Sequence, residues 1–287
     1  MEGLILQGLV SGVLSAGLYA LISVGLALAI GVIGIVNFAH GEFFMVGAFL
    51  AYQLFVSFGL DPALSLFIVA PALFALGALI YQSTIRFVLR APELNQMLLT
   101  FGIGIVLQNL ALAIWGGDPR PISNVPYRSL GFQVAGVNVG AVPLASFVIS
   151  LLLIGLLYTL LFRTPVGRAM RAVAQNRTGA TLVGLEVNRI YLLAFALSAA
   201  LAGLGGVMIA VIQSPTPGVG FAFTLKAFAI VVLAGLGNIR GILWAALVVA
   251  VAESLVATLL PSGDTLRNAV FFAVIFVVLI VRSRRLT

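Results

Sequence analysis

The sequence predicts an all-α membrane protein, a polytopic helix bundle with about eight or nine transmembrane segments that include a half-helix. Residues 3–41 contain no Asp, Glu, Lys or Arg, and a run of about 18 apolar residues with few charges already indicates a spanning helix. Hydrophobic residues make up 62% of the chain and charged residues 8%, against about 25% charged in soluble domains. No polar stretch is long enough for a separate core, so residues 1–287 are predicted to form a single transmembrane domain.

Charged residues and proline-rich breaks divide the chain into roughly nine apolar segments. We place them at residues 4–34, 38–57, 63–85, 94–115, 141–162, 190–213, 222–236, 241–260 and 266–283. The first is long enough to be tilted or broken. The seventh is predicted to be the half-helix, because a bilayer core takes about 20 residues to cross.

Basic residues fall between these segments, which favours membrane topology over nucleic-acid binding for a chain of net charge +7. They form three clusters: Arg86 and Arg90; Arg163, Arg168, Arg171, Arg177 and Arg189; Arg282, Arg284 and Arg285. Cytoplasmic loops collect Lys and Arg, and an even number of segments separates the clusters. The 163–189 loop and the C-terminus are therefore predicted to be cytoplasmic, and the 116–140 loop, the 214–218 turn and the N-terminus to lie outside.

The sequence lacks the residues and motifs that several classes of enzyme need. The chain has no cysteine and one histidine, which argues against disulfides and against a His/Cys metal site. It contains no G-x-x-x-x-G-K-[ST] phosphate loop and no H-E-x-x-H motif. We therefore expect no enzyme activity and no cofactor or metal bound by this chain.

Small residues four positions apart indicate close helix packing. Gly8 and Gly12, Ala199 and Gly203, and Ala202 and Gly206 have this spacing. Such pairs let helix backbones approach in lipid, where no hydrophobic effect drives association.

Polar residues inside the apolar runs are the candidate functional positions. Asn37, His40 and Glu42 interrupt the first two segments, and polar groups at membrane depth usually face a cavity or a partner. They could line or gate a pathway. They could equally form a short wet turn, with Asn37 capping the next helix and Glu42 in its first turn.

A second break, at 235–241, contains Gly235, Gly237 and Asn238, and glycine-interrupted segments point to transporter sites. Gln108 could bond across helices or face solute. Lys226, the only lysine, could extend outward to the membrane surface or attract an anion, and outward extension is favoured. Glu253 is expected to be paired.

The 163–189 loop carries five arginines and one glutamate and has helix-compatible spacing. It is long enough to fold into short helices. It could be an attachment surface for a soluble partner or a basic interfacial helix on anionic lipid.

Three stretches together resemble one known family. They are VIGIVNFAHGEFFMVGAFLAY (32–52), GRAMRAVAQNRTGATLVGLEVNRI (167–190) and LKAFAIVVLAGLGNIRG (225–241). The chain is similar, collinearly and over nearly its whole length, to the permease subunits of bacterial branched-chain amino acid ABC importers, of the LivH type rather than its LivM partner. The first stretch, with NFAHGEF intact, is highly specific.

The resemblance implies that the 163–189 loop couples the permease to an ATPase, whose groove receives the loop's short helices. The predicted coupling residues are Arg168, Arg171, Ala172, Ala174, Gln175 and Gly184. The last four fall where the family's Glu-Ala-Ala…Gly pattern is expected, although Gln175 and Asn176 stand where many relatives carry acidic residues. The predicted pathway residues are Asn37, His40, Glu42, Gln108, Gly235, Gly237 and Asn238.

The resemblance also implies the partners and the location. They are a second, LivM-like permease subunit, two cytoplasmic ATPase subunits that use ATP and Mg, and an extracytoplasmic solute-binding protein, in a bacterial inner membrane with its lipid and without nucleic acid. Urea or short amides are alternative cargoes. The competing hypotheses are a free-standing channel or proton-coupled carrier that uses Glu42, His40 and Glu253, and a membrane scaffold.

Overall fold

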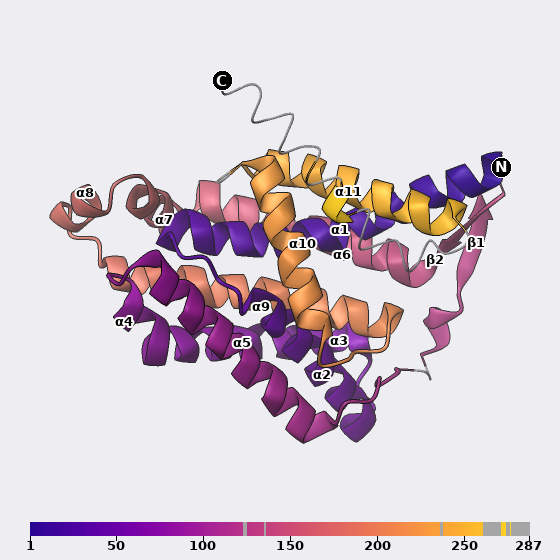
Figure 1. The fold of residues 1–287 in the computed structure, drawn as a ribbon, viewed down its shortest axis with the longest axis horizontal. Coiled ribbons are helices and arrows are strands. Elements are labelled where there is room, and N and C mark those ends of the chain that lie inside the picture. Colours follow the sequence, from indigo (N-terminus) through magenta and orange to yellow (C-terminus); the bar gives the residue numbers. More distant parts are fainter. Residues whose placement is uncertain (123–124, 135, 236–237, 261–270, 274–275, 277–287) are drawn as a thin grey trace.

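The computed structural model describes residues 1–122, 125–134, 136–235, 238–260, 271–273 and 276. Figure 1 shows that helices dominate the architecture and that the longest of them run along the long axis. In chain order the elements are α1 (Glu2–Ile33), α2 (His40–Phe58), α3 (Pro62–Ile80), the π-helical turn η1 (Tyr81–Ile85), α4 (Arg86–Val88), α5 (Glu93–Trp115), the 3₁₀ turn η2 (Pro126–Arg128), β1 (Gly131–Val134), β2 (Val137–Gly140), α6 (Ala141–Arg163), α7 (Pro165–Gln175), α8 (Arg177–Leu182), α9 (Val187–Ile212), α10 (Val219–Ala234) and α11 (Ile239–Leu259).

The predicted membrane bundle is confirmed. Within the described residues, seven helices are long and apolar enough to cross a membrane. The 16-residue α10 is the short helix predicted at 222–236. The ninth predicted segment, 266–283, lies outside the described residues except for 271–273 and 276.

The 116–140 loop contains one element that the all-α prediction did not include. β1 and β2 pair as an antiparallel hairpin, with Gly131 opposite Gly140 and Val134 opposite Val137. The hairpin follows a loop with three prolines. Pairing of the two strands satisfies the hydrogen bonds of backbone N–H and C=O groups that a helix would otherwise satisfy.

Two helices, α1 and α9, form the centre of the bundle. Their most apolar windows are 83% and 89% buried, against 22% for α5. α1 packs along α11, α9 and α6, and α9 packs along α2 and α3. The peripheral helices therefore leave most of their apolar surface for lipid.

Hydrogen bonds bring three segments of the chain together at one end of the bundle. The side-chain amide of Gln7, near the N-terminus, donates to the Asn138 carbonyl in the hairpin at 3.0 Å. The hydroxyl of Tyr127 donates to Asp61, which caps α3, at 2.7 Å. The N-terminus, the α2–α3 turn and the 116–140 loop thus share one end, as the predicted topology requires. The compartment that this end faces stays a prediction.

Small residues bring α2 and α9 into backbone contact, as their spacing predicted. A Cβ on Gly206 would overlap the Phe44 carbonyl of α2, and a Cβ on Gly47 would overlap the Gly203 backbone of α9. The Gly8 and Gly12 pair meets Leu255 and Val251 of α11 in the same way. These glycines are packing positions.

Gly206→Leu is expected to lower the free energy of unfolding by about 1–3 kcal/mol, because the side chain forces α2 away from α9. Thermal unfolding of the detergent-purified protein measures the change. Gly102→Leu is the matched control, since nothing lies within 4 Å of an added Cβ at Gly102. Equal stability of the two variants would contradict the close crossing.

Candidate functional site: broken helices, a buried ion pair and a surface helix pair

The chain breaks between α1 and α2 and re-enters the bundle. α1 ends at Gly34, whose φ of 81° lies in the left-handed region that glycine tolerates. After a non-helical link at 34–39, α2 begins at His40 beside the middle of α1, because Nε2 of His40 lies 2.9 Å from the Ile22 carbonyl oxygen. α2 therefore starts about halfway along the bundle, rather than at its surface.

His40 joins three helices at this point. Because a carbonyl only accepts, Nε2 donates to Ile22 of α1, and Nδ1 lies 3.3 Å from the Ser198 hydroxyl oxygen of α9. In a neutral ring the carbonyl partner places the proton on Nε2, and Nδ1 then accepts from Ser198. The side chain is fully buried. His40 thus has both ring nitrogens bonded and acts as a structural junction of α1, α2 and α9.

Two threonines, which the sequence analysis missed, satisfy the backbone of the link. Thr100 of α5 accepts from the Phe38 N–H at 3.2 Å and lies 3.1 Å from the Val36 carbonyl. Thr224 of α10 accepts from the Gly41 N–H at 2.8 Å. Non-helical backbone at membrane depth needs such partners. Their only signal in the sequence is a threonine within an apolar run.

The predicted wet turn is buried. Asn37 is 1% exposed and its side-chain oxygen accepts from the Ala39 N–H at 3.1 Å, just before α2 rather than within its first turn. Asn37 therefore shapes the turn and does not cap the helix directly.

Glu42 is the acidic side chain of this junction. It is 4% exposed, and within the described residues its Oε2 has no hydrogen-bond partner. A Cβ on Gly220 would overlap its carboxyl group, and a Cβ on Gly104 would lie 3.5 Å from its Cγ. The carboxyl group therefore stands between α10 and α5, with Oε2 left as an unused hydrogen-bond acceptor among the described residues. Gln108 is half-buried one turn after Gly104 on α5.

An ion pair lies at the crossing of α1, α10 and α11. Nζ of Lys226 lies 2.9 Å from Glu253, and the Tyr19 hydroxyl donates to the same carboxylate at 2.6 Å. Lys226 is 8% exposed, so the prediction that it extends outward was wrong: Glu253, on another helix, holds it inside. The predicted pairing of Glu253 is confirmed. Tyr19 and Lys226 also line a cavity of about 450 Å³ between α1, α6, α9 and α10.

The second predicted group of pathway residues lies at the other end of α10. Gly235 ends α10 with φ 83°, and the Asn238 side chain caps α11 by accepting from the Gly241 N–H at 3.0 Å. Eleven residues separate Thr224 from Gly235, which is about 16 Å of helix. The structure therefore keeps Gly235 and Asn238 apart from Asn37, His40 and Glu42. Gly237 lies outside the described residues.

The 163–189 loop forms two short helices, as predicted. Thr164 caps α7 by accepting from the Gly167 N–H at 3.1 Å, and Met170 and Val173 are buried against the bundle. A Cβ on Gly167 would overlap the carbonyl groups of Leu160 and Leu161. α7 is therefore held tightly against the end of α6.

The predicted coupling residues of α7 differ in how exposed they are. Arg168, Ala174 and Gln175 are exposed on α7, whereas Arg171 and Ala172 are half-buried. Gly184 ends α8 with φ 83°, and its N–H donates to the Thr181 carbonyl at 3.0 Å. The structure thus gives Gly184 a turn-forming position beyond α8.

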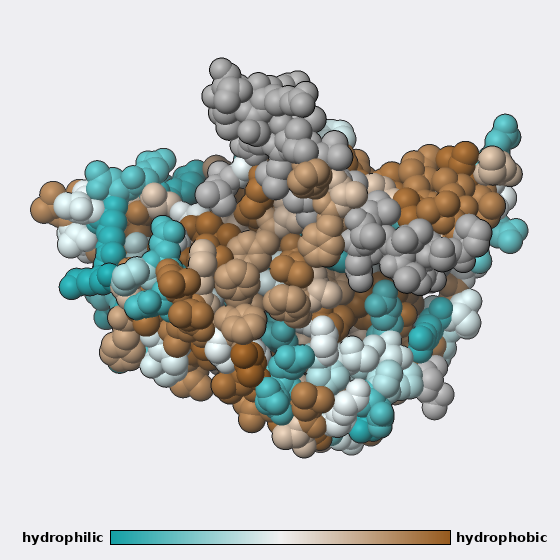
Figure 2. All heavy atoms as spheres, in the orientation of Figure 1, coloured by the Kyte–Doolittle hydropathy of each residue, from teal (hydrophilic) through white to brown (hydrophobic). Residues whose placement is uncertain are grey.

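Two apolar side chains at the tip of α8 were missed by sequence reasoning. Leu182 is 83% exposed and Val183 is 76% exposed. Figure 2 shows hydrophobic surface at this tip among the hydrophilic residues of α7 and α8. Leu182 and Val183 therefore place apolar surface at the tip of an otherwise polar element.

Across the part of the chain that the structure describes, no three His, Cys, Asp or Glu side chains lie close enough together to bind a metal ion.

Comparisons with known proteins agree with this architecture. Residues 8–279 match the family model described as branched-chain amino acid transport system / permease component. The chain is 32% identical to the high-affinity branched-chain amino acid transport system permease protein BraD of Pseudomonas aeruginosa, over 96% of this chain and 94% of that protein. It is 30% identical to the probable permease protein LivH of Methanocaldococcus jannaschii, over 98% and 90%.

A more distant type of permease matches as well. The LivM permease protein of Escherichia coli is 30% identical over 83% of this chain and 61% of its own length. No solved structure matches. The family match covers nearly all of the described bundle, from the first turns of α1 onward. The chain belongs to the family of permease components of branched-chain amino acid transport systems.

Proposed function

We propose that this chain is the membrane permease subunit of an ABC importer that carries branched-chain amino acids into the cytoplasm. The proposal rests on the α7–α8 pair. This surface element is fixed to the end of a membrane bundle and has an exposed apolar tip. The chain lacks a phosphate loop, so ATP and Mg would be used by two separate cytoplasmic subunits docked at this tip.

The packing of α7 supports mechanical coupling. Gly167 leaves no space between α7 and the last turn of α6, and Met170 and Val173 are buried beneath the helix. α7 also contacts α1 and α9, the two central helices. A displacement of α7 by a docked ATPase is therefore transmitted to the spans, and alternating access follows from two states with different partner contacts.

The cargo is assigned from the relatives and from Glu42. The relatives BraD and LivH are named as branched-chain amino acid permeases, and the buried carboxyl group of Glu42 offers an acceptor for a solute's ammonium group. In this proposal a second, LivM-like permease completes the pathway, and an extracytoplasmic binding protein delivers the solute. The 163–189 loop and the C-terminus then face the cytoplasm of a cell whose inner membrane holds the complex.

The alternative of a free-standing proton-coupled carrier is not favoured. Such a carrier needs Glu42, His40 and Glu253 to exchange protons along one path. His40 instead has both ring nitrogens bonded to Ile22 and Ser198, and Glu253 is paired with Lys226.

Reconstitution tests the proposal. The chain is co-expressed with its second permease and ATPase subunits, purified and placed in liposomes that contain ATP and Mg, with binding protein and radiolabelled leucine outside. We expect leucine to accumulate with ATP but not with a non-hydrolysable analogue, and not in liposomes that contain this chain alone. Accumulation by the chain alone under a pH gradient would overturn the proposal.

A further inference from the structure

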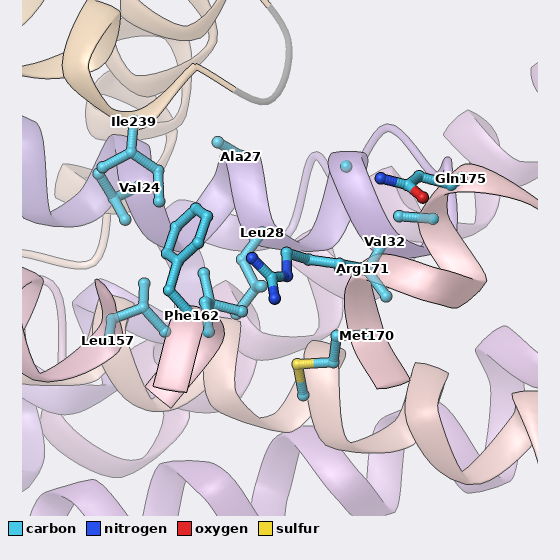
Figure 3. A pocket seen from close by; sticks show the side chains of 13 residues that line it. Val24, Ala27, Leu28, Val32, Leu157, Phe162, Met170, Arg171, Gln175 and Ile239 are labelled. Carbon is cyan, nitrogen blue, oxygen red and sulfur yellow. The ribbon is translucent and has the colours of Figure 1, made fainter. Parts of the chain in front are cut away.

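A second cavity lies beside the surface helices, at the end of the bundle opposite the hairpin. It has a volume of about 360 Å³ and lies between α1, the end of α6, α7 and the first residue of α11. Figure 3 shows side chains from these elements around it. The lining is apolar except for Arg171 and Gln175. One water molecule occupies about 30 Å³ in the liquid, so the cavity is large enough for several water molecules. Its walls, however, offer water few hydrogen-bond partners.

Arg171 points into this cavity. Figure 3 shows its guanidinium group directed from α7 toward Leu28 and Phe162, and its Cζ lies 4.6 Å from the centroid of the Phe162 ring. The ion pairs of the described residues are Arg189–Glu186 and Lys226–Glu253, and neither involves Arg171. A guanidinium with several donors, partly removed from water and without an acidic partner in the described part of the chain, favours an anionic ligand.

We propose that the cavity holds an anionic phospholipid, with an acyl chain among the apolar residues and the phosphate on Arg171. The cavity lies at the ends of α1 and α6, and hence at the level where lipid headgroups meet spanning helices. Basic pockets between membrane helices bind anionic headgroups, and Arg171 is the basic residue that lines this cavity. Lipid binding at this site does not require the proposed transport activity.

The geometry favours a lipid over two other occupants. An ATPase docked on α7 and α8 meets their outer face, where Arg168 is exposed, whereas the Arg171 guanidinium is turned toward the spans. A translocated amino acid needs an acceptor for its ammonium group, and no carboxylate lines the cavity. A chain-shaped hydrocarbon with an anionic end matches both the lining and the charge.

The position of the lipid gives it a structural effect. It would fill the space between α7 and the spans, and α7 is the proposed coupling helix. Bound lipid would therefore hold α7 at a fixed distance from α1, so that removal of anionic lipid is expected to weaken coupling as well as to empty the cavity.

Native mass spectrometry of the delipidated, detergent-purified chain tests the site, with added phosphatidylglycerol or phosphatidylcholine. We expect preferential retention of phosphatidylglycerol, and a loss of about fivefold in its affinity in Arg171→Gln, the effect of one basic contact near a membrane surface. Arg168→Gln, on the exposed face of the same helix, is the matched charge control and is expected to retain wild-type lipid affinity.

A second pair of variants tests the cavity without changing charge. Gly31 lines the cavity and nothing lies within 4 Å of an added Cβ there, so Gly31→Phe fills the space without a clash at Cβ. Gly155→Phe is the control, because Gly155 of α6 is equally open and lies outside the cavity. We expect Gly31→Phe to lose retained lipid and Gly155→Phe to keep it.

Three results would overturn the inference. One is equal retention of phosphatidylglycerol by the wild type, Arg171→Gln and Gly31→Phe. Another is displacement of the lipid by millimolar inorganic phosphate alone, which would indicate a simple anion site. The third is a Gly31→Phe chain that keeps phosphatidylglycerol but loses its ATPase subunits, which would assign the cavity to the protein partner.

Discussion

Replacement of both Leu182 and Val183 by aspartate is expected to reduce ATP-driven leucine uptake to background. These two side chains are the exposed apolar tip of the α7–α8 pair. Full burial of a Leu or Val side chain contributes about 1.5–3 kcal/mol, and a buried charge without a partner adds a desolvation cost. The double variant should therefore lose its ATPase subunits while it remains inserted in the membrane.

Co-purification of the ATPase subunits with tagged permease measures the docking directly, and uptake in the reconstituted complex measures its consequence. Leu130→Asp is the matched control, because Leu130 is 59% exposed in the loop at the opposite end of the bundle, and it should keep the ATPase subunits. If Leu182→Asp/Val183→Asp retained full ATPase binding, the tip of α8 would not be the docking surface.

Lys226→Met is expected to lower the free energy of unfolding by about 3–5 kcal/mol, since it leaves the Glu253 carboxylate buried without its cation. Glu253→Gln removes the opposite charge and should destabilise similarly. The double variant Lys226→Met/Glu253→Met replaces the pair by apolar side chains and is expected to recover most of the stability. This recovery distinguishes a lost ion pair from a general disturbance of the α1, α10 and α11 crossing.

Unfolding of the purified variants in mixed micelles, titrated with a denaturing detergent, gives the double-mutant cycle. Glu186→Gln is the control, because the Arg189–Glu186 pair is mostly exposed, at 76% and 61% of the side chains, and exposed pairs contribute little. If the losses of unfolding free energy added up in the Lys226 and Glu253 double variant, the two residues would act independently. That result would contradict the ion pair seen in the structure.

Much of the fold could be predicted from the sequence, because a bilayer imposes length and apolarity on every span. The charge-free run at 3–41 predicted α1, and the short apolar run at 222–236 predicted α10. The small-residue pairs at Gly8 and Gly203 predicted packing positions correctly, since close backbone contact requires them. The family resemblance, based on NFAHGEF and two other stretches, is confirmed by the family match over 8–279.

The contacts that build the candidate site could not be predicted, because they join residues far apart in the chain. The residues at 34–36 are apolar, so nothing local shows that α2 starts halfway along the bundle. Pairing of Lys226 with Glu253 depends on the crossing of α10 and α11. Leu182 and Val183 have the composition of buried residues, and only their placement beyond the bundle shows that they are exposed.

The α1–α2 link imposes an order on biosynthesis. His40 bonds to Ser198, 158 residues later in the chain, and Gly41 bonds to Thr224, 183 residues later. While the ribosome is still making the middle of the protein, these polar groups have none of their final partners from α9 and α10. The first turn of α2 therefore cannot settle into its final depth during early insertion, and the N-terminal third of the chain is completed only after the C-terminal third has entered the bilayer.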